Sequence, residues 1–348
     1  MIRPLAALFM AVSMSVSMAG AAEKITVYQY SEYIDPEIPK AFTAATGINV
    51  DLQFYESQDD MLNRLRQPGG AAQYDVIVAT DVVIPQVIGL KLVQKVDAKL
   101  VPNAVNIAAH LAKPFFDPQQ EYVFPYQWGT VGLVYRTSVV KMKPEEVSWS
   151  LILGDKPAGR FLFMDETKSC IGSVLRAAGH SVNSVDAGEL KIAGGTLAKA
   201  KGNPLCLGFA GGVDGRDRVI KGEADIAMVY NGDAVKVLPE DGSVAFANPK
   251  EGTVRWVDCM MISSGSKNVS GAAKWINFIL DPKVGAQLSN FNRYATPNSA
   301  SMPMINDKDR TNVAVYPTAE QLKVTESQRD LGKSERVYKD IWTAVKSH

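Results

Sequence analysis

Three short stretches of this 348-residue chain set an aromatic side chain beside a carboxylate or an amide. They are Tyr30 with Glu32, Trp256 with Asp258, and Tyr230 with Asn231 and Asp233. A carboxylate attracts an ammonium group, the face of an aromatic ring attracts a cation, and the rest of the ring offers methylene groups an apolar wall. The pattern therefore favours a site for ammonium groups carried on a methylene chain. Each pair alone is also typical of core packing or helix capping.

Motifs of the common enzyme classes are missing from the sequence. It has no GxSxG, no HExxH and no Walker A motif, and the glycine-rich stretch 211–215 lacks the GxGxxG spacing, so we expect a loop there. The three histidines, His110, His180 and His348, are far apart, so acid–base catalysis would have to use carboxylates alone. We therefore predict a protein without catalytic activity, metal or cofactor. An exported α/β enzyme acting on a small substrate is the alternative class.

The elements that must position these residues alternate between strands and helices. Strands are expected to start near Ile25 and to cover 48–54, 74–78, 161–164, 224–230 and 251–258, with two more flanking a crossover within 123–135. Helices are expected over 37–46, 59–66, 171–178, 187–197, 271–280 and 333–345, with another opening at Asp281. This order predicts an α/β fold with mostly parallel sheets flanked by helices. Ligands bind outside the carboxyl ends of such strands, so residues 30–33, Thr80 and Asp81 are expected on one rim. Trp256 and Asp258 are two residues apart, so they are expected on the same side of their strand.

Residues 1–22 have the pattern of a cleaved signal peptide, with a short positive start, an apolar run and small residues at the cleavage site. No later apolar run is long enough to span a bilayer, so we predict a periplasmic protein. The remaining 326 or so residues are more than one hydrophobic core usually serves, and two lobes are expected. The segment 123–135 carries Gly and Pro between apolar stretches and is expected to cross between the lobes, where Trp128 either plugs the hinge or lines a cleft.

Charge and cysteine content narrow the partners further. Without Arg3 of the signal peptide, 36 basic and 37 acidic side chains remain, and no basic stripe indicates nucleic acid or anionic lipid as a partner. Cys170 and Cys206 lie in loop-like surroundings and are predicted to pair in an oxidising compartment, whereas Cys259 is predicted to be a buried strand residue.

Several motifs together give the chain a family resemblance. They are Tyr-Gln-Tyr-Ser-Glu-Tyr-Ile at 28–34, Phe-Pro-Tyr-Gln-Trp-Gly-Thr at 124–130, Tyr-Asn-Gly-Asp at 230–233, Pro-Lys-Glu-Gly at 249–252 followed by Trp-Val-Asp at 256–258, and Tyr-Ala-Thr-Pro-Asn at 294–298. In this order the chain resembles the periplasmic spermidine/putrescine-binding proteins of ABC importers. The resemblance implies a monomer with two α/β lobes that close on a small amine by hinge motion and present it to permease subunits. The lobes are expected to comprise 23–131 with 258–302, and 132–257 with 303–348.

The resemblance also implies a set of ligand-binding residues. They are Tyr30, Ser31, Glu32, Tyr33, Thr80, Glu166, Ser169, Tyr230, Asp233, Trp256, Asp258, Tyr294 and Gln328. Trp256 and Asp258 match an aromatic–carboxylate pair that grips a terminal ammonium. Tyr30 and Tyr230 stand where the family commonly has tryptophan.

Departures from the family pattern bear on the identity of the ligand. Ser169 stands where a glutamate normally meets an amine, Lys168 is its neighbour, and Val82 and Val235 replace aromatic residues of spermidine and putrescine binders. Unpaired buried charge is costly, so losing a carboxylate favours a ligand with fewer positive charges. Putrescine or a related polyamine is expected first. The alternative is an ω-amino acid such as 4-aminobutyrate, with its carboxylate on Arg216, Arg255 or Arg293. A ferric-ion binder ranks last, because it requires closely paired tyrosines.

Overall fold

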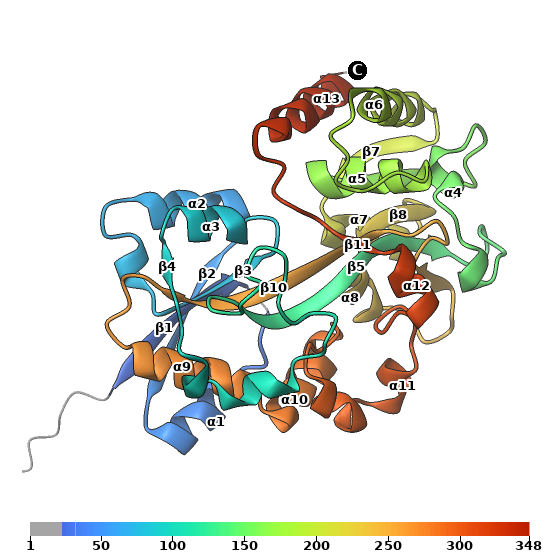
Figure 1. Cartoon of the computed structure of the whole chain (residues 1–348). Helices are drawn as coiled ribbons and strands as arrows, with labels where there is room; N and C mark the ends of the chain where they lie inside the picture. The colour runs from blue at the N-terminus through green and yellow to red at the C-terminus, as the bar shows by residue number, and fades with distance from the viewer. Residues whose placement is uncertain (1–22, 32, 348) are drawn as a thin grey trace, which may run out of the picture.

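The computed structural model describes residues 23–31 and 33–347 (Figure 1). The predicted signal peptide and Glu32 lie outside the described residues. The chain forms two α/β lobes, and Figure 1 shows each lobe with helices on both sides of its strands. This two-lobed α/β arrangement confirms the predicted fold class.

Within the described residues, eleven strands form one hydrogen-bonded sheet. Eight follow the order β2-β1-β3-β10-β5-β8-β6-β7, and β4, β9 and β11 pair at its sides. The strands are β1 (Lys24–Tyr30), β2 (Asn49–Tyr55), β3 (Val76–Thr80), β4 (Val93–Gln94), β5 (Phe124–Arg136), β6 (Phe161–Met164), β7 (Cys206–Ala210), β8 (Ile226–Tyr230), β9 (Val244–Ala247), β10 (Val254–Ser263) and β11 (Glu326–Ser327). Pairs β1–β2, β1–β3, β6–β7 and β6–β8 are parallel, and β10 runs antiparallel to both β3 and β5.

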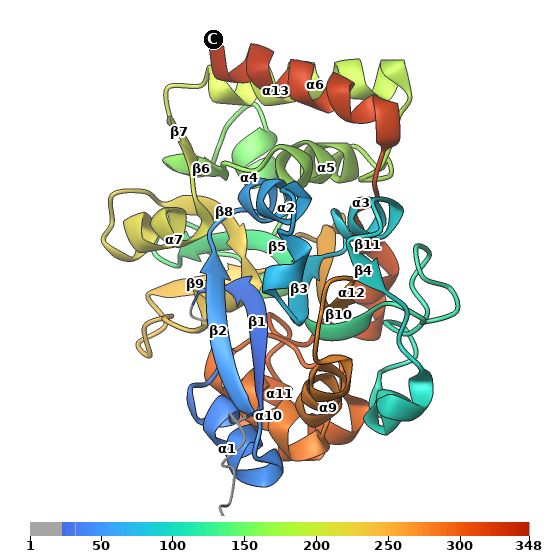
Figure 2. The same ribbon diagram turned by 90° about the vertical axis from the view of Figure 1, so that its left-hand side faces the viewer.

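The helices cover these strands from both sides. They are α1 (Glu37–Thr46), α2 (Gln58–Arg66), α3 (Ile84–Gly89), α4 (Ser150–Leu153), α5 (Thr167–Ala177), α6 (Ala187–Lys201), α7 (Gly212–Ile220), α8 (Asn231–Val235), α9 (Val269–Ile279), α10 (Pro282–Asn292), α11 (Asp307–Arg310), α12 (Ala319–Val324) and α13 (Glu335–Ser347). Figure 2 shows α6 and α13 side by side at the end of one lobe, with α1 and α9 at the far end of the other.

Two long strands connect the lobes. The first part of β5, Phe124–Thr130, pairs with β10, and its second part, from Val131 on, pairs with β8 and β9. Trp128 is buried in β5, and its indole N–H donates a hydrogen bond to the carbonyl of Thr296, at 3.1 Å. This contact favours the plugging role over the lining role for Trp128. The residue boundaries expected for the lobes stay a prediction.

Helix ends explain where the sequence-based boundaries were right and wrong. Gly47 adopts a left-handed conformation, with φ of 75°, and ends α1 where expected. Helix α5 begins at Thr167, four residues before the expected start at 171, because the Glu166 side chain caps it. The expected loop at 211–215 is wrong, because α7 begins at Gly212.

The cysteines give a mixed outcome. Cys259 is buried in β10, as predicted. The predicted disulfide is not formed in this structure: Cys170 is buried within α5, Cys206 begins β7, and both are free thiols. Their surroundings are therefore a helix and a strand rather than the loops that the sequence indicated. Burial raises the pKa of the Cys170 thiol well above its ordinary value.

Candidate ligand-binding site

One predicted site residue, Asp258, is a buried carboxylate at the junction of the two lobes. It lies on β10 opposite Thr80 of β3 and Gln127 of β5. The Tyr33 hydroxyl donates a hydrogen bond to its Oδ2 atom, at 2.6 Å. Asp258 is only 5% exposed, and within the described residues no lysine or arginine lies within ion-pair distance of it.

Burial sets the charge behaviour of Asp258. It raises the pKa of this carboxyl from 3.8 to about 6, and the hydrogen bond from Tyr33 opposes part of that rise. At neutral pH the carboxylate is therefore mostly ionised although no protein cation neutralises it. A buried anion without a counter-ion is costly unless something else supplies positive charge.

Four tyrosine rings lie close enough to this carboxylate for its charge to raise their pKa, and they come from β1, the loop after it, β5 and the segment after α10. Tyr33 meets Tyr30, Tyr126 and Tyr294 edge to face, with ring centroids 6.0, 5.2 and 5.9 Å apart. The Tyr126 hydroxyl donates to the backbone carbonyl of Tyr33, at 2.8 Å, and so fixes the loop after β1. Tyr126 belongs to the Phe-Pro-Tyr-Gln-Trp-Gly-Thr motif at 124–130, but no sequence pattern predicts its contact with Tyr33.

A second aromatic group continues the wall along β10. Trp256 meets Tyr230 at 6.0 Å and Tyr294 at 5.1 Å between ring centroids, both edge to face. The Tyr294 hydroxyl donates to Asp233 Oδ1, at 2.5 Å. The Trp256 indole N–H is buried and has no hydrogen-bond partner among the described residues, so it is a donor available to a ligand.

Close approach of these rings depends on two glycines. A side-chain carbon at Gly129 would collide with the Trp256 ring and with Asn231, and one at Gly232 would collide with the Tyr294 ring. Both positions therefore need glycine for the aromatic group to assemble as it does.

A third group comes from the start of α5. Glu166 accepts hydrogen bonds from the backbone N–H groups of Lys168 and Ser169, at 3.2 and 2.7 Å, as a helix cap. The Gln328 side chain donates to the Ser169 hydroxyl, at 3.3 Å. Glu166 also lies near the aromatic rings. Its charge adds to the effect of burial in raising the pKa of both Tyr30 and Tyr230.

Ser31 and Lys168 were both singled out in the sequence, the first as a site residue and the second as a nearby cation. Ser31 is exposed, and Lys168 donates to Glu335 at 2.8 Å and to the carbonyl of Arg329 at 2.5 Å. The Lys168 charge is thus neutralised by Glu335 of α13, a contact between residues 167 positions apart that no local sequence pattern predicts.

The three arginines considered for a ligand carboxylate are also engaged. Arg216 pairs with Asp217, Arg293 pairs with Asp309, and Arg255 donates to Ser327 from the opposite face of β10. None of the three therefore offers a free guanidinium to a ligand lying against Asp258 and the rings of Tyr30, Tyr33, Tyr230 and Trp256.

Two further polar residues of this region, Gln58 and Asp81, were not among the predicted ligand-binding residues. Gln58 donates to the Tyr30 hydroxyl at 2.5 Å and to the Tyr55 hydroxyl at 3.1 Å. Asp81 is 2% exposed, and burial together with the charge of Asp258 raises its pKa to about 8. The position of Asp81 after a strand was visible in the sequence, but its proximity to Asp258 depends on the β3–β10 pairing.

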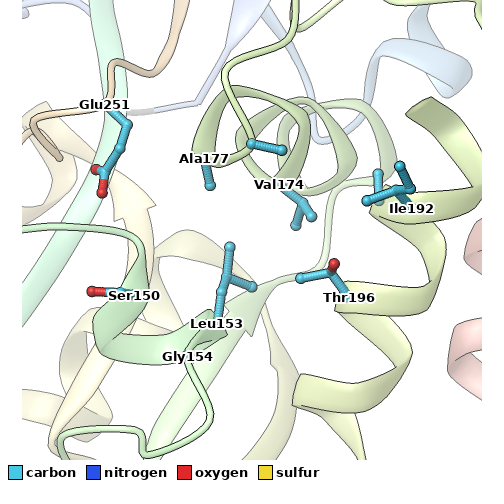
Figure 3. Close-up of a pocket in the computed structure, with 10 residues that line it drawn as sticks. Ser150, Leu153, Gly154, Val174, Ala177, Ile192, Thr196 and Glu251 are labelled. Atoms are coloured by element: carbon cyan, nitrogen blue, oxygen red, sulfur yellow. The ribbon is translucent and has the colours of Figure 1, made fainter.

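A separate cavity of about 210 Å³ lies between α4, α5 and α6 (Figure 3). Figure 3 shows that Leu153, Val174 and Ile192 point into it, while Glu251 stands at its edge. The Glu251 carboxylate accepts a hydrogen bond from Ser148, so it is already partnered. This cavity is mostly apolar and includes none of the predicted site residues.

The structure also bears on metal binding and on membrane insertion. Across residues 23–31 and 33–347, no group of three or more His, Cys, Asp or Glu side chains could hold a metal ion. No helix in the same ranges is both long and apolar enough to cross a membrane.

Comparison with known families agrees with this geometry. A sequence model described as "Bacterial extracellular solute-binding protein" matches residues 37–313. The chain therefore belongs to the bacterial extracellular solute-binding proteins.

Curated relatives extend over almost the whole chain. The spermidine/putrescine-binding periplasmic protein of Escherichia coli (strain K12) is 29% identical over 343 residues, which cover 99% of this chain and 97% of that protein. The putrescine/cadaverine-binding protein of Pseudomonas aeruginosa is 29% identical over 342 residues, covering 95% of each.

Solved structures give the same picture. The spermidine/putrescine ABC transporter substrate-binding protein of Streptococcus pneumoniae superposes with a TM-score of 0.84 at 26% identity, covering 94% of this chain and 99% of that one. A GABA receptor of known structure has a TM-score of 0.74 at 16% identity, which shows a shared fold alone.

Proposed function

We propose that this chain is the periplasmic solute-binding protein of an ABC importer and that it binds a small amine of the putrescine/spermidine type. The carrying observation is Asp258, a buried carboxylate with a pKa of about 6 and no cationic partner among the described residues. An ammonium group supplies the positive charge that this position lacks. The names of the relatives support the same ligand class.

The remaining groups suit the rest of such a ligand. The Tyr30, Tyr230 and Trp256 rings offer walls for methylene groups and π faces for cations. Glu166, Ser169 and Gln328 would meet the other end. Because Glu166 already accepts two backbone hydrogen bonds and Ser169 carries no charge, that end demands less positive charge than Asp258 does.

The two-lobed fold supports a mode of action in which the lobes close on the ligand. We assign 23–131 with 258–302 to one lobe and 132–257 with 303–348 to the other, and β5 and β10 would bend as the lobes close on the ligand. Residues 1–22 would direct export and be removed. The protein would act as a monomer, without catalysis, and pass its ligand to permease subunits.

The structure gives the ω-amino acid alternative little support. Such a ligand needs a cation for its carboxylate, and Arg216 and Arg293 pair with protein carboxylates while Arg255 faces away from the cluster. A small amine without a carboxylate is therefore the better fit.

The test is titration calorimetry of the purified mature protein with putrescine, spermidine, agmatine, 4-aminobutyrate and 5-aminovalerate. We expect at least one of the first three to bind and the two amino acids to bind more weakly. Mass spectrometry of the recovered ligand should show it chemically unchanged. Failure of all three amines to bind, or their turnover by the protein alone, would overturn the proposal.

A further inference from the structure

A second cavity, of about 300 Å³, lies on the face of β10 that points away from Asp258. Trp256 and Asp258 face the aromatic cluster, whereas Arg255, Val257 and Cys259, which alternate with them, line this cavity. Its other walls are the segments 110–116 and 325–329, which are distant in sequence. The volume is at the small end of the range for pockets that hold organic ligands.

The cavity carries an excess of positive charge. Arg255 is largely buried, and its only hydrogen bond among the described side chains is to the Ser327 hydroxyl, at 3.0 Å. Arg329 lies over the Phe115 ring, at 5.1 Å, and Lys113 is exposed at the rim. Within residues 23–31 and 33–347, none of these three cations has a carboxylate oxygen within 4.0 Å.

The two acids of the cavity do not balance that charge. Glu326 turns its carboxylate to the Ser181 hydroxyl, at 2.7 Å, and to the Asn183 side chain, at 3.0 Å. Asp81 is buried, and burial together with the charge of Asp258 raises its pKa to about 8, although the charge of Arg255 opposes part of that rise. The partly buried Arg255 guanidinium therefore has a carboxyl group in its neighbourhood but, among the described residues, no carboxylate oxygen within 4.0 Å, which is the converse of the situation at Asp258.

Apolar surface adjoins the arginines. The Phe115 side chain is half exposed, and Phe116, Leu111 and Val257 also line the cavity. An inorganic anion would leave this surface in water, whereas an organic anion would cover it.

We propose that this cavity is a second binding site, for a small organic carboxylate with an apolar body about the size of one ring. Arg255 and Arg329 hold the carboxylate, and the body packs on Phe115. The site is separate from the amine site and does not depend on the identity of its ligand.

Benzoate is the probe, and benzamide is its neutral control of the same shape. Calorimetry with the mature protein, without any amine present, should show benzoate binding about tenfold or more tightly than benzamide, because charge-assisted hydrogen bonds are roughly twice as strong as neutral ones. Arg255→Gln and Arg329→Gln should each weaken benzoate binding about tenfold. Arg66→Gln removes an exposed charge outside the cavity and should leave benzoate binding as in the wild type.

The Arg329 variant keeps the test decisive even if the Arg255 variant does not fold, because the Arg329 side chain is exposed. Equal binding of benzoate and benzamide, no benzoate binding at all, or benzoate binding that survives the Arg329 change would overturn the proposal. Because the assay contains no amine, any of these results leaves the amine-binding proposal untouched.

Discussion

The two faces of β10 present opposite chemistries within four residues. Trp256 and Asp258 give one face a ring and a buried carboxylate, while Arg255 and Val257 give the other a guanidinium and an apolar surface. Among the described residues, neither the carboxylate nor the guanidinium has an oppositely charged group within 4.0 Å. Strand geometry alone produces this separation, because successive side chains point to opposite sides. One strand that joins both lobes can therefore carry two sites of opposite charge.

The neighbouring strand β3 repeats the contrast. Thr80 and Asp81 are adjacent, yet Thr80 lies opposite Asp258 and Asp81 lines the cavity on the other side. Asp258 accepts a hydrogen bond from Tyr33 and keeps its pKa near 6, whereas Asp81, close to the charge of Asp258, reaches about 8. The two carboxyl groups thus have different pKa values in the folded protein. Changing Asp258 is expected to affect amine binding, and changing Asp81 is expected to affect how stability depends on pH.

The largest effect is expected from Asp258→Ala. Removing the buried carboxylate should weaken amine binding by about 2 to 5 kcal/mol, because an ammonium would then be buried without its partner. Calorimetry with putrescine measures the change. Asp340→Ala removes an exposed carboxylate of α13 and serves as the control. Unchanged putrescine affinity in the Asp258 variant would remove this residue from the site.

The pH dependence of stability tests Asp81. Its pKa is raised from 3.8 to about 8 in the folded protein, so the folded state holds a proton that the unfolded state releases between those values. The stability that this proton contributes is complete below about pH 4 and is lost as pH rises to about 8, at about 1.4 kcal/mol per pH unit. Asp258 is largely ionised above pH 6, so the interval from 6 to 8 reports mainly on Asp81.

We therefore expect the ligand-free wild-type protein to lose about 2 kcal/mol of unfolding free energy from pH 6 to pH 8. Asp81→Asn should lose much less over the same interval, while Asp340→Asn should follow the wild type. Urea denaturation at several pH values gives these free energies. Parallel curves for Asp81→Asn and the wild type would mean that Asp81 is already ionised when folded.

Strand β10 and helix α1 show which local features the sequence predicts correctly. The two-residue spacing of Trp256 and Asp258 was enough to place them on one face, and the glycine at 47 was enough to end α1. The Tyr33–Asp258 hydrogen bond was beyond reach, because it joins residues 225 positions apart through the pairing of β3 with β10.

The start of α5 shows a second limit. The family resemblance implied a ligand carboxylate at Glu166, whereas in the structure Glu166 accepts the N–H groups of Lys168 and Ser169 as a helix cap. The partner of Lys168, Glu335, belongs to α13, far along the chain. The net charge around Glu166 and Lys168 therefore depends on contacts between elements that are distant in sequence, and local sequence patterns do not predict such contacts.

A smaller effect is expected from Tyr33→Phe, which keeps the ring and removes the hydroxyl that donates to Asp258. Amine binding should weaken by about 1 kcal/mol. The hydroxyl also holds the pKa of Asp258 down, so the pH at which binding is half lost on acidification should move upward in this variant. Calorimetry with putrescine from pH 5 to pH 8 measures both changes.

Tyr338→Phe is the matched control for that experiment. It removes a buried hydroxyl that donates to the carbonyl of Ser184 in the other lobe, so it should leave the pH midpoint of amine binding in place. An equal shift of the midpoint in both variants would show that the effect comes from general destabilisation rather than from Asp258.

The smallest effect on putrescine affinity is expected from substituting Arg255, which lies on the face of β10 opposite Asp258. Arg255→Gln removes a positive charge next to Trp256 but directed away from it, so putrescine binding should tighten slightly, by less than about 0.5 kcal/mol. Arg255→Lys keeps the charge and should leave the affinity as it is. If Arg255→Gln instead weakened putrescine binding tenfold while Arg255→Lys did not, the arginine charge would support the amine site through the strand. The two faces would then act as one site rather than as the two that side-chain alternation predicts.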